Sequence, residues 1–222
     1  ADVFVSGPGV GDIKGGTVMG LWAMRAMVEL LKDYDLQMIV SVDEEIGSPT
    51  IKDWYANPQA HGADYAIGLE PGFPQGELTP TVPLGVVDKR RGYAAIRFTV
   101  HGKNAHSGTP HLGLSAVEAV AHKILKMQAL NAPERGVSVN VGMVHGGTAP
   151  NTVAGEVVST VSFRYETMED GEATRQAIEE IIKESHVTNS DLDLTDSSTY
   201  EVVTFIPPME KTDTSQGLVK IV

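Results

Sequence analysis

The sequence has no cysteine, no long uninterrupted apolar run and few basic residues, and each shortage excludes a class of protein. Without cysteine there is no disulfide scaffold, no cysteine-ligated zinc site and no thiol nucleophile. The nearest approach to a membrane helix, residues 17–31, is too short and carries Arg25 and Glu29. With 29 acidic and 17 basic side chains the formal net charge is −12, which argues against nucleic acid or an anionic membrane surface as a partner.

The chain has 222 residues, of which 41% are apolar, enough for one large domain or two small ones. It opens at Ala1, within a stretch that has the pattern of a strand. We therefore expect the sequence to be the central piece of a longer protein. Most of the acidic surplus lies in residues 1–89, where it fits either a solvated surface or a cation site.

Residues 1–89 alternate short apolar stretches with helix signals. Strands are expected at residues 2–6, 37–42 and 63–69, and helices at residues 17–33 and 48–60. The second helix has a clear start, because Ser48-Pro49 supplies an N-cap residue followed by a first-turn proline. Strands that alternate with helices predict a mostly parallel α/β sheet.

The pattern changes near Gly92, where alternation of apolar and polar residues begins. It predicts strands at residues 93–101, 136–144, 155–165 and 191–205, and helices at residues 113–130 and 169–185. The order βαββαβ is typical of a ferredoxin-like domain, an antiparallel four-stranded sheet with two helices on one face. Residues 90–206 are therefore expected to form a domain inserted into the α/β domain, which residues 1–89 begin and residues 207–222 resume.

Acidic residues follow the three expected strands of the first segment. Asp12 lies in GPGVGDIKGG, Glu44 and Glu45 lie in VDEEIGS, and Glu70 lies in GLEPG. Ligands bind at the carboxyl ends of the strands in α/β sheets, so these side chains are expected to line one crevice. Carboxylates bind divalent cations, which makes the crevice a candidate metal site. Neighbours on an extended chain point to opposite sides, so one glutamate can hold an ion while the other reaches a water beside it.

Each of these acids also has a structural explanation. Asp12 would stabilise the N-terminus of the following helix, the acids at 43–45 would cap the helix at Ser48, and Glu70 would be a turn residue. A phosphate-binding loop at residues 7–16 is disfavoured, because the spacing is not GxGxxG and Asp12 would repel an anion. The pattern alone leaves the metal site and the structural roles open.

The second segment adds three candidates. His106 lies in GKNAHSG, Asn151 follows GGTAP, and Arg164 lies on the expected strand at 155–165. Each alone is typical of a structural residue: a turn histidine, a turn asparagine and a surface arginine. The other six histidines show no metal-ligand spacing such as HxxxH.

The segments GPGVGDIKGG, VDEEIGS, GLEPG and GKNAHSG, in this order and spacing, resemble those of the co-catalytic di-zinc exopeptidase family. That family includes glutamate carboxypeptidase, aminoacylase, acetylornithine deacetylase and succinyl-diaminopimelate desuccinylase, and the sequence is most similar to the glutamate carboxypeptidase branch. The resemblance covers essentially the whole chain. It implies an α/β zinc-peptidase catalytic domain interrupted by a ferredoxin-like dimerisation (lid) domain. The periodicity by itself predicts only that a ferredoxin-like domain is inserted into an α/β domain.

The resemblance implies two zinc ions, with cobalt or manganese as alternatives. Asp12 would bridge both ions and be followed by a cis peptide bond to Ile13, Glu45 and Glu70 would each ligate one ion, and Glu44 would be the general base. Such a pair of ions activates water and stabilises the charge that forms when an amide is attacked.

The resemblance also implies substrate contacts and a homodimer through the inserted domain. His106 would reach the active site of a partner subunit and polarise the scissile carbonyl. Asn151 would contact the substrate, and Arg164 would bind its terminal carboxylate, which suits the planar fork of donors on a guanidinium.

The sequence departs from the family pattern at several points. The family's zinc site also uses a histidine from an upstream His-x-Asp motif and a histidine near the C-terminus, and neither lies within these 222 residues. We therefore expect these residues alone to bind zinc weakly and to be inactive. Ala154 stands where the family often has proline, and Ser162 stands where an acid is common two residues before Arg164.

The predicted function is that of a zinc-dependent metallopeptidase, active in the full-length protein. It would hydrolyse a C-terminal peptide bond or an N-acyl amino-acid amide bond, so its substrate would be a small peptide or an N-acyl amino acid. Two alternatives stay open. One is an amino-acid deacylase or desuccinylase of the same family, and the other is a non-catalytic dimerisation module with a defunct metal site.

Overall fold

The computed structural model describes residues 7–30, 32–74 and 84–219. The chain forms two compact units, one of residues 1–88 with 211–222 and the other of residues 89–210. We call them the first unit and the second unit. No helix within the described ranges is both long enough and apolar enough to cross a membrane.

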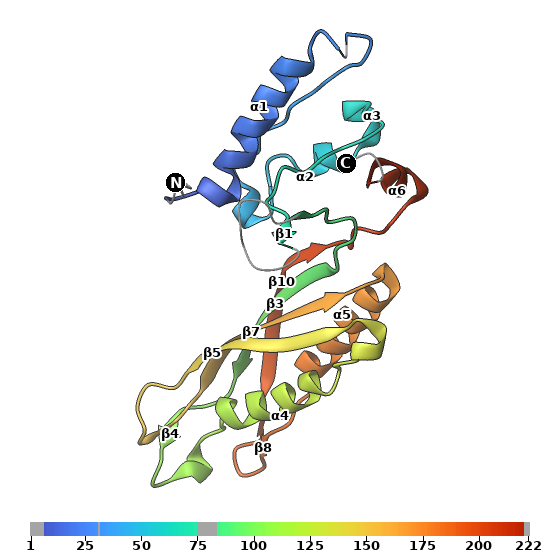
Figure 1. Cartoon of the computed structure of the whole chain (residues 1–222). Coiled ribbons are helices and arrows are strands. Elements are labelled where there is room, and N and C mark those ends of the chain that lie inside the picture. The colour runs from blue at the N-terminus through green and yellow to red at the C-terminus, as the bar shows by residue number, and fades with distance from the viewer. Residues whose placement is uncertain (1–6, 31, 75–83, 220–222) are drawn as a thin grey trace. The chain divides into compact units, whose positions relative to one another are not determined.

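The second unit is built on a four-stranded sheet in the order β10-β3-β7-β5, with every neighbouring pair antiparallel (Figure 1). Its strands are β3 (Gly92–His101), β5 (Ser138–Gly146), β7 (Glu156–Tyr165) and β10 (Ser197–Ile206). Two helices, α4 (Ala116–Gln128) and α5 (Met168–Lys183), pack on one face. This arrangement confirms the ferredoxin-like βαββαβ fold.

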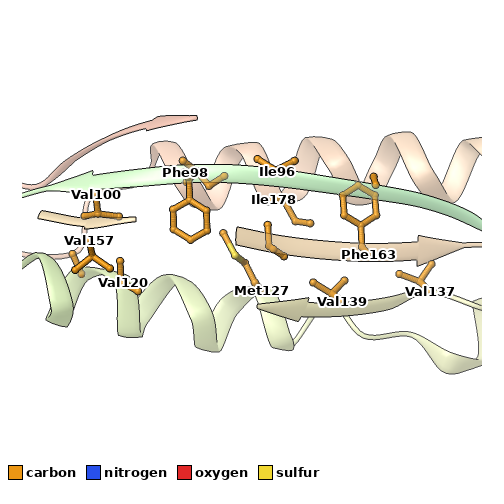
Figure 2. Packing of buried hydrophobic residues seen from close by; sticks show 14 of the residues in the cluster. Ile96, Phe98, Val100, Val120, Met127, Val137, Val139, Val157, Phe163 and Ile178 are labelled. Carbon is orange, nitrogen blue, oxygen red and sulfur yellow. The ribbon is translucent and has the colours of Figure 1, made fainter. Parts of the chain in front are cut away.

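Successive side chains along each strand point to opposite faces of the sheet, so one set points towards the helices. Ile96 and Phe98 of β3 and Phe163 of β7 meet Met127 of α4 and Ile178 of α5 in a single core (Figure 2). We call the other side of the sheet the helix-free face, and it carries the odd-numbered residues 93–101 of β3 and the even-numbered residues 156–164 of β7. Burial of large apolar side chains on only one side fixes which residues remain available for binding.

Helices α4 and α5 each begin directly after a capping residue, whatever the start of their apolar pattern. The Ser115 hydroxyl oxygen accepts the Glu118 N–H at 3.2 Å, and the Thr167 hydroxyl oxygen accepts the Asp170 N–H at 3.1 Å. Both contacts satisfy N–H groups that the first helical turn leaves without partners. The expected helix at 113–130 therefore starts at Ala116.

The expected strand at 191–205 is shorter than predicted. Its first part folds into a hairpin of β8 (Thr188–Asn189) and β9 (Leu194–Thr195), so that β10 starts at Ser197. The Asn189 side-chain oxygen accepts the Asp191 and Leu192 N–H groups at 3.1 and 3.3 Å, and Asp193 has a positive φ of 52°. These are the contacts of a tight turn, which interrupts an extended strand. The remaining short elements of this unit are β4 (Ala105–His106), η3 (Pro110–Leu112), η4 (Pro133–Arg135) and β6 (Thr152–Val153).

In the first unit, most of the regular elements among the described residues are short helices. Its elements are η1 (Val10–Lys14), α1 (Gly15–Met27), η2 (Glu44–Ile46), α2 (Lys52–Tyr55), α3 (Pro58–His61), β1 (Phe73–Pro74), β2 (Leu84–Gly85) and α6 (Asp213–Val219). The helix expected at 48–60 is two short helices, because Pro58 lacks the N–H that would continue the first one. The helix expected at 17–33 ends at Met27 and continues as a turn, in which Leu30 N–H donates to the Met27 carbonyl.

No strand is assigned to residues 37–42 or 63–69, where the sequence predicted parallel strands. A strand is stable only when its backbone groups pair with a neighbour, and neither segment has such a partner among the described residues. Their apolar side chains are exposed accordingly: Val42 is 93% exposed and Ile67 is 65% exposed. The expected strand at residues 2–6 lies outside the described residues.

Candidate active site

The loop after residue 41 shows which of its three consecutive acids has a structural role. The Asp43 carboxylate accepts the Thr50 N–H at 2.9 Å, the Thr50 hydroxyl at 2.7 Å and the Ser41 hydroxyl at 2.9 Å. These hydrogen bonds, those with Thr50 first, hold the pKa of Asp43 below its ordinary value. Asp43 therefore holds this loop closed, which is the structural role considered above for the acids at 43–45. Its neighbours Glu44 and Glu45 are not needed for that role.

Glu44 and Glu45 form the short helix η2, which Gly47 ends with a positive φ of 88°. The exposed carboxyl group of Glu45 has a raised pKa, because the charge of Asp12 and then that of Glu44 oppose its ionisation. Asp12 also lies close enough to Glu45 for a side-chain hydrogen bond. The structure therefore brings together three of the four predicted acids, from segments that are far apart in the sequence.

Asp12 itself lies in η1, at the turn that leads into α1. The peptide bond between Asp12 and Ile13 is cis, as the resemblance implied. The turn starts at Gly9, whose positive φ of 71° favours glycine, and the Lys14 ammonium donates to the Pro8 carbonyl at 3.0 Å. These contacts place the Asp12 carboxyl group at the beginning of the helix.

Glu70 follows a segment that packs closely on α1. A Cβ atom at Gly16 would overlap the Leu69 carbonyl oxygen, and one at Gly20 would overlap the Leu69 side chain. Only glycine at these helix positions lets residue 69 approach so closely. Within the described residues, no group of three or more His, Asp or Glu side chains has the arrangement of a metal site. The metal-ligating roles of Asp12, Glu45 and Glu70 therefore stay predictions.

In the second unit, His106 and Asn151 lie in adjacent loops. His106 of β4 pairs with Thr152 of β6, and the Ser107 N–H donates to the Asn151 carbonyl at 2.9 Å. The His106 Nδ1 accepts the Gly108 N–H at 3.0 Å, so the neutral ring carries its proton on Nε2. An exposed Nε2–H is a donor that could polarise a carbonyl group.

Arg164 lies near the opposite end of the sheet, on the helix-free face of β7. It pairs in register with Tyr93, close to the start of β3, whereas β4 follows the end of β3 at His101. The 10 residues of β3 span about 30 Å. The structure thus brings His106 and Asn151 together but separates both from Arg164 within one subunit. Tyr93 was not a candidate from the sequence, since its position opposite Arg164 depends on the register of two strands.

Comparison with known proteins identifies the class to which this architecture belongs. Residues 89–189 match the family described as the peptidase dimerisation domain of the M20 peptidases. The chain is 25% identical over 189 residues to carboxypeptidase G2 of Pseudomonas sp. (strain RS-16), covering 84% of this chain and 44% of that protein. It is 30% identical over 190 residues to a peptidase M20 domain-containing protein of Schizosaccharomyces pombe, covering 82% of this chain and 44% of that protein.

A solved structure has the same fold over most of the chain. The aminopeptidase PepT of Bacillus cereus matches 90% of this chain and 53% of its own, with a TM-score of 0.63 and 23% identity. The chain therefore carries an M20 peptidase dimerisation domain and is similar in sequence to M20 peptidases, which confirms the family that the four motifs resemble. It spans less than half the length of the curated relatives described above.

Proposed function

We propose that the full-length protein is a zinc-dependent metallopeptidase that hydrolyses a C-terminal peptide bond or an N-acyl amino-acid amide bond. The observation that carries this proposal is the convergence of the Asp12, Glu44 and Glu45 carboxyl groups, which raises the pKa of Glu45. A divalent cation would stabilise these like-charged carboxyl groups, and the similarity to M20 peptidases supports such a site.

The donor set fits zinc in part. Asp12, Glu45 and Glu70 are the proposed ligands, and carboxylate oxygens bind zinc. Histidine is another common zinc ligand, and the first 60 residues contain none. Bound zinc would supply Lewis acidity at the scissile carbonyl. The Glu44 carboxylate, adjacent to this cluster, would take a proton from the attacking water and pass it to the leaving amine.

The second unit supplies groups that bind and orient the substrate. Arg164 would donate to the substrate carboxylate, and the His106 Nε2–H would donate to the scissile carbonyl oxygen. Because about 30 Å of strand separates the two side chains in one subunit, a small substrate cannot contact both of them there. This separation supports a homodimer in which His106 and Asn151 act in the site of the partner subunit.

An activity panel of N-acyl amino acids and dipeptides, run on full-length protein with added zinc, tests the proposal. Turnover of substrates with a free carboxylate, together with stoichiometric zinc by elemental analysis, is the expected result. Preference for removing an acyl group rather than a C-terminal residue would favour the deacylase alternative. A folded protein without turnover or bound metal would be a dimerisation module instead.

Arg164→Ala should raise KM for substrates with a free carboxylate by about tenfold or more, because a charge-assisted pair of hydrogen bonds is lost. The KM for the matching C-terminal amides should change little. Arg97→Ala is the matched control, since Arg97 shares the helix-free face but is exposed and paired with Glu201 at 3.2 Å. Equal effects on acids and amides would remove Arg164 from substrate recognition.

The proposed dimer surface consists of the outer face of α4 and the outer edge of β5. Val117 and Leu125 of α4 are 51% and 70% exposed, and Met143 and Val144 of β5 are 53% and 47% exposed. Within the described residues β5 pairs only with β7, so its other edge has no strand partner, although the Asn131 side chain bonds the N–H and the carbonyl of Val139 there. An apolar helix face beside an unpaired strand is suited to self-association about a two-fold axis.

Leu125→Glu should weaken this dimer by at least about tenfold, because it places a charge in an apolar interface while keeping a good helix former. Sedimentation velocity of the full-length protein over a concentration series measures the shift towards monomer. Gln176→Glu adds the same charge on the exposed side of α5 and should leave the dimer intact. A dimer unaffected by Leu125→Glu would place the interface elsewhere.

A further inference from the structure

The aromatic ring of Tyr93 lies under the guanidinium group of Arg164. The two residues are directly opposite each other on β3 and β7, and the Arg164 Cζ atom is 4.8 Å from the ring centroid. Both side chains are on the helix-free face, away from the core of the second unit. A guanidinium at this distance from a ring is attracted by the negative charge of the ring face.

Among the residues that the structure describes, no carboxylate pairs with Arg164. Within the described residues its side chain makes no ion pair or hydrogen bond, and its neighbours on the same face include Ser162 along β7 and Ser138 across on β5. Glu166, two residues further along, is paired with the Lys89 ammonium at 2.6 Å. The contact with the Tyr93 ring is therefore the one interaction of this guanidinium that the described residues provide.

Stacking on a ring and pairing with a carboxylate have different consequences for binding. A carboxylate partner would use two of the five guanidinium N–H donors and would compete with a substrate carboxylate. A ring contacts the flat face of the guanidinium and leaves the in-plane donors available. It also restricts a flexible side chain before the substrate arrives, which reduces the entropy lost on binding.

We propose that Tyr93 is a positioning residue, whose ring orients the Arg164 guanidinium for a substrate carboxylate. The inference rests on the proposed role of Arg164 in substrate binding. Its consequence is specific, because loss of the ring should weaken binding of carboxylate substrates while leaving kcat nearly unchanged. The Tyr93 hydroxyl has no hydrogen bond among the described residues, so phenylalanine should replace tyrosine with little effect.

The test compares full-length Tyr93→Leu with Tyr93→Phe, on the substrate that the activity panel turns over fastest and on its C-terminal amide. Tyr93→Leu should raise KM for the acid by between about threefold and about thirtyfold, and Tyr93→Phe should behave like the wild type. Neither variant should change KM for the amide. Combined with Arg164→Ala, Tyr93→Leu should add nothing, since the group that it positions is gone.

A spectroscopic measurement tests the stacking without any substrate. The ring current of Tyr93 should shift the Arg164 Nε–H proton resonance, and the shift should survive in Tyr93→Phe and disappear in Tyr93→Leu. Absence of the shift in the wild type, or a Tyr93→Leu enzyme with unchanged KM while Arg164→Ala is impaired, would overturn the role of Tyr93 alone. Normal use of carboxylate substrates by Arg164→Ala would instead overturn the proposed role of Arg164.

Discussion

Replacing Glu44 by glutamine should abolish hydrolysis by the full-length protein while leaving its metal content unchanged. Glutamine has the size of glutamate but cannot accept the proton of an attacking water, so kcat should fall by about 10²–10⁴-fold or more. The metal should stay, because Glu44 is not among the proposed ligands, whereas its neighbour Glu45 is. Steady-state kinetics and elemental analysis on the same preparation measure the two properties.

Asp64→Asn is the control for this prediction, since Asp64 is an exposed acid of the same unit outside the Asp12, Glu44 and Glu45 cluster. It should keep the activity of the wild type. Activity of Glu44→Gln within tenfold of the wild type would show that Glu44 is not the base. Joint loss of metal and activity would make Glu44 a ligand instead.

The strands and helices of the second unit could be predicted from the sequence because each follows from a pattern of neighbouring residues. Alternation over residues 93–101 and 155–165, and helical spacing in between, give the strands and helices of a ferredoxin-like fold to within a few residues. The register of β3 against β7 is different, since it depends on contacts between residues distant in the sequence. For that reason Arg164 was a candidate from the sequence and Tyr93 was not.

The first unit was predicted less well. The apolar runs at 37–42 and 63–69 are typical of buried strands, but a run predicts burial only when other chain segments cover and pair with it. The structure places Asp12 near Glu45, and the roles predicted for these acids stay predictions. What the sequence could not supply was which of the acids at 43–45 has the structural role, and the three hydrogen bonds of Asp43 to Ser41 and Thr50 identify it.

A lysine in the core of the second unit also went unrecognised, although the sequence carried a signal. The buried residues of α4 are Ala116, Ala119, Val120, Lys123 and Met127, so Lys123 occupies a position on the apolar face of the helix. Its side chain is fully buried, and its ammonium donates to the carbonyls of Ile181, Ile182 and Glu184 at the end of α5, that of Ile182 at 3.0 Å. It thereby satisfies carbonyls that the last turn of a helix leaves without partners.

Lys123 also faces a buried carboxylate. Its ammonium is 3.6 Å from Oδ2 of Asp196, and both side chains are inaccessible to solvent. The other oxygen of Asp196 accepts the N–H groups of His186 and Val187 at 2.6 and 2.7 Å. Burial lowers the pKa of Lys123, and the charge of Asp196 opposes that shift. The pair therefore links α4, the end of α5 and the chain just before β10.

Lys123→Met should destabilise the second unit by about 3–5 kcal/mol, because it leaves Asp196 as an uncompensated buried charge and removes the donor for three carbonyls. Lys126→Met, one turn along α4, is the matched control. It breaks an exposed pair with Glu184 at 2.6 Å and should cost about 0–1 kcal/mol. Hydrogen exchange of the β3 and β7 amides measures both changes within this unit.

Adding Asp196→Asn to Lys123→Met separates the two causes of this loss. Asparagine keeps an oxygen for the His186 and Val187 N–H groups but carries no charge, so the double variant should be more stable than Lys123→Met alone. Recovery would identify the isolated charge as the main cost, whereas no recovery would assign the cost to the carbonyls at the end of α5. Equal exchange in Lys123→Met and Lys126→Met would contradict the prediction, because a buried ammonium and an exposed one would then contribute alike.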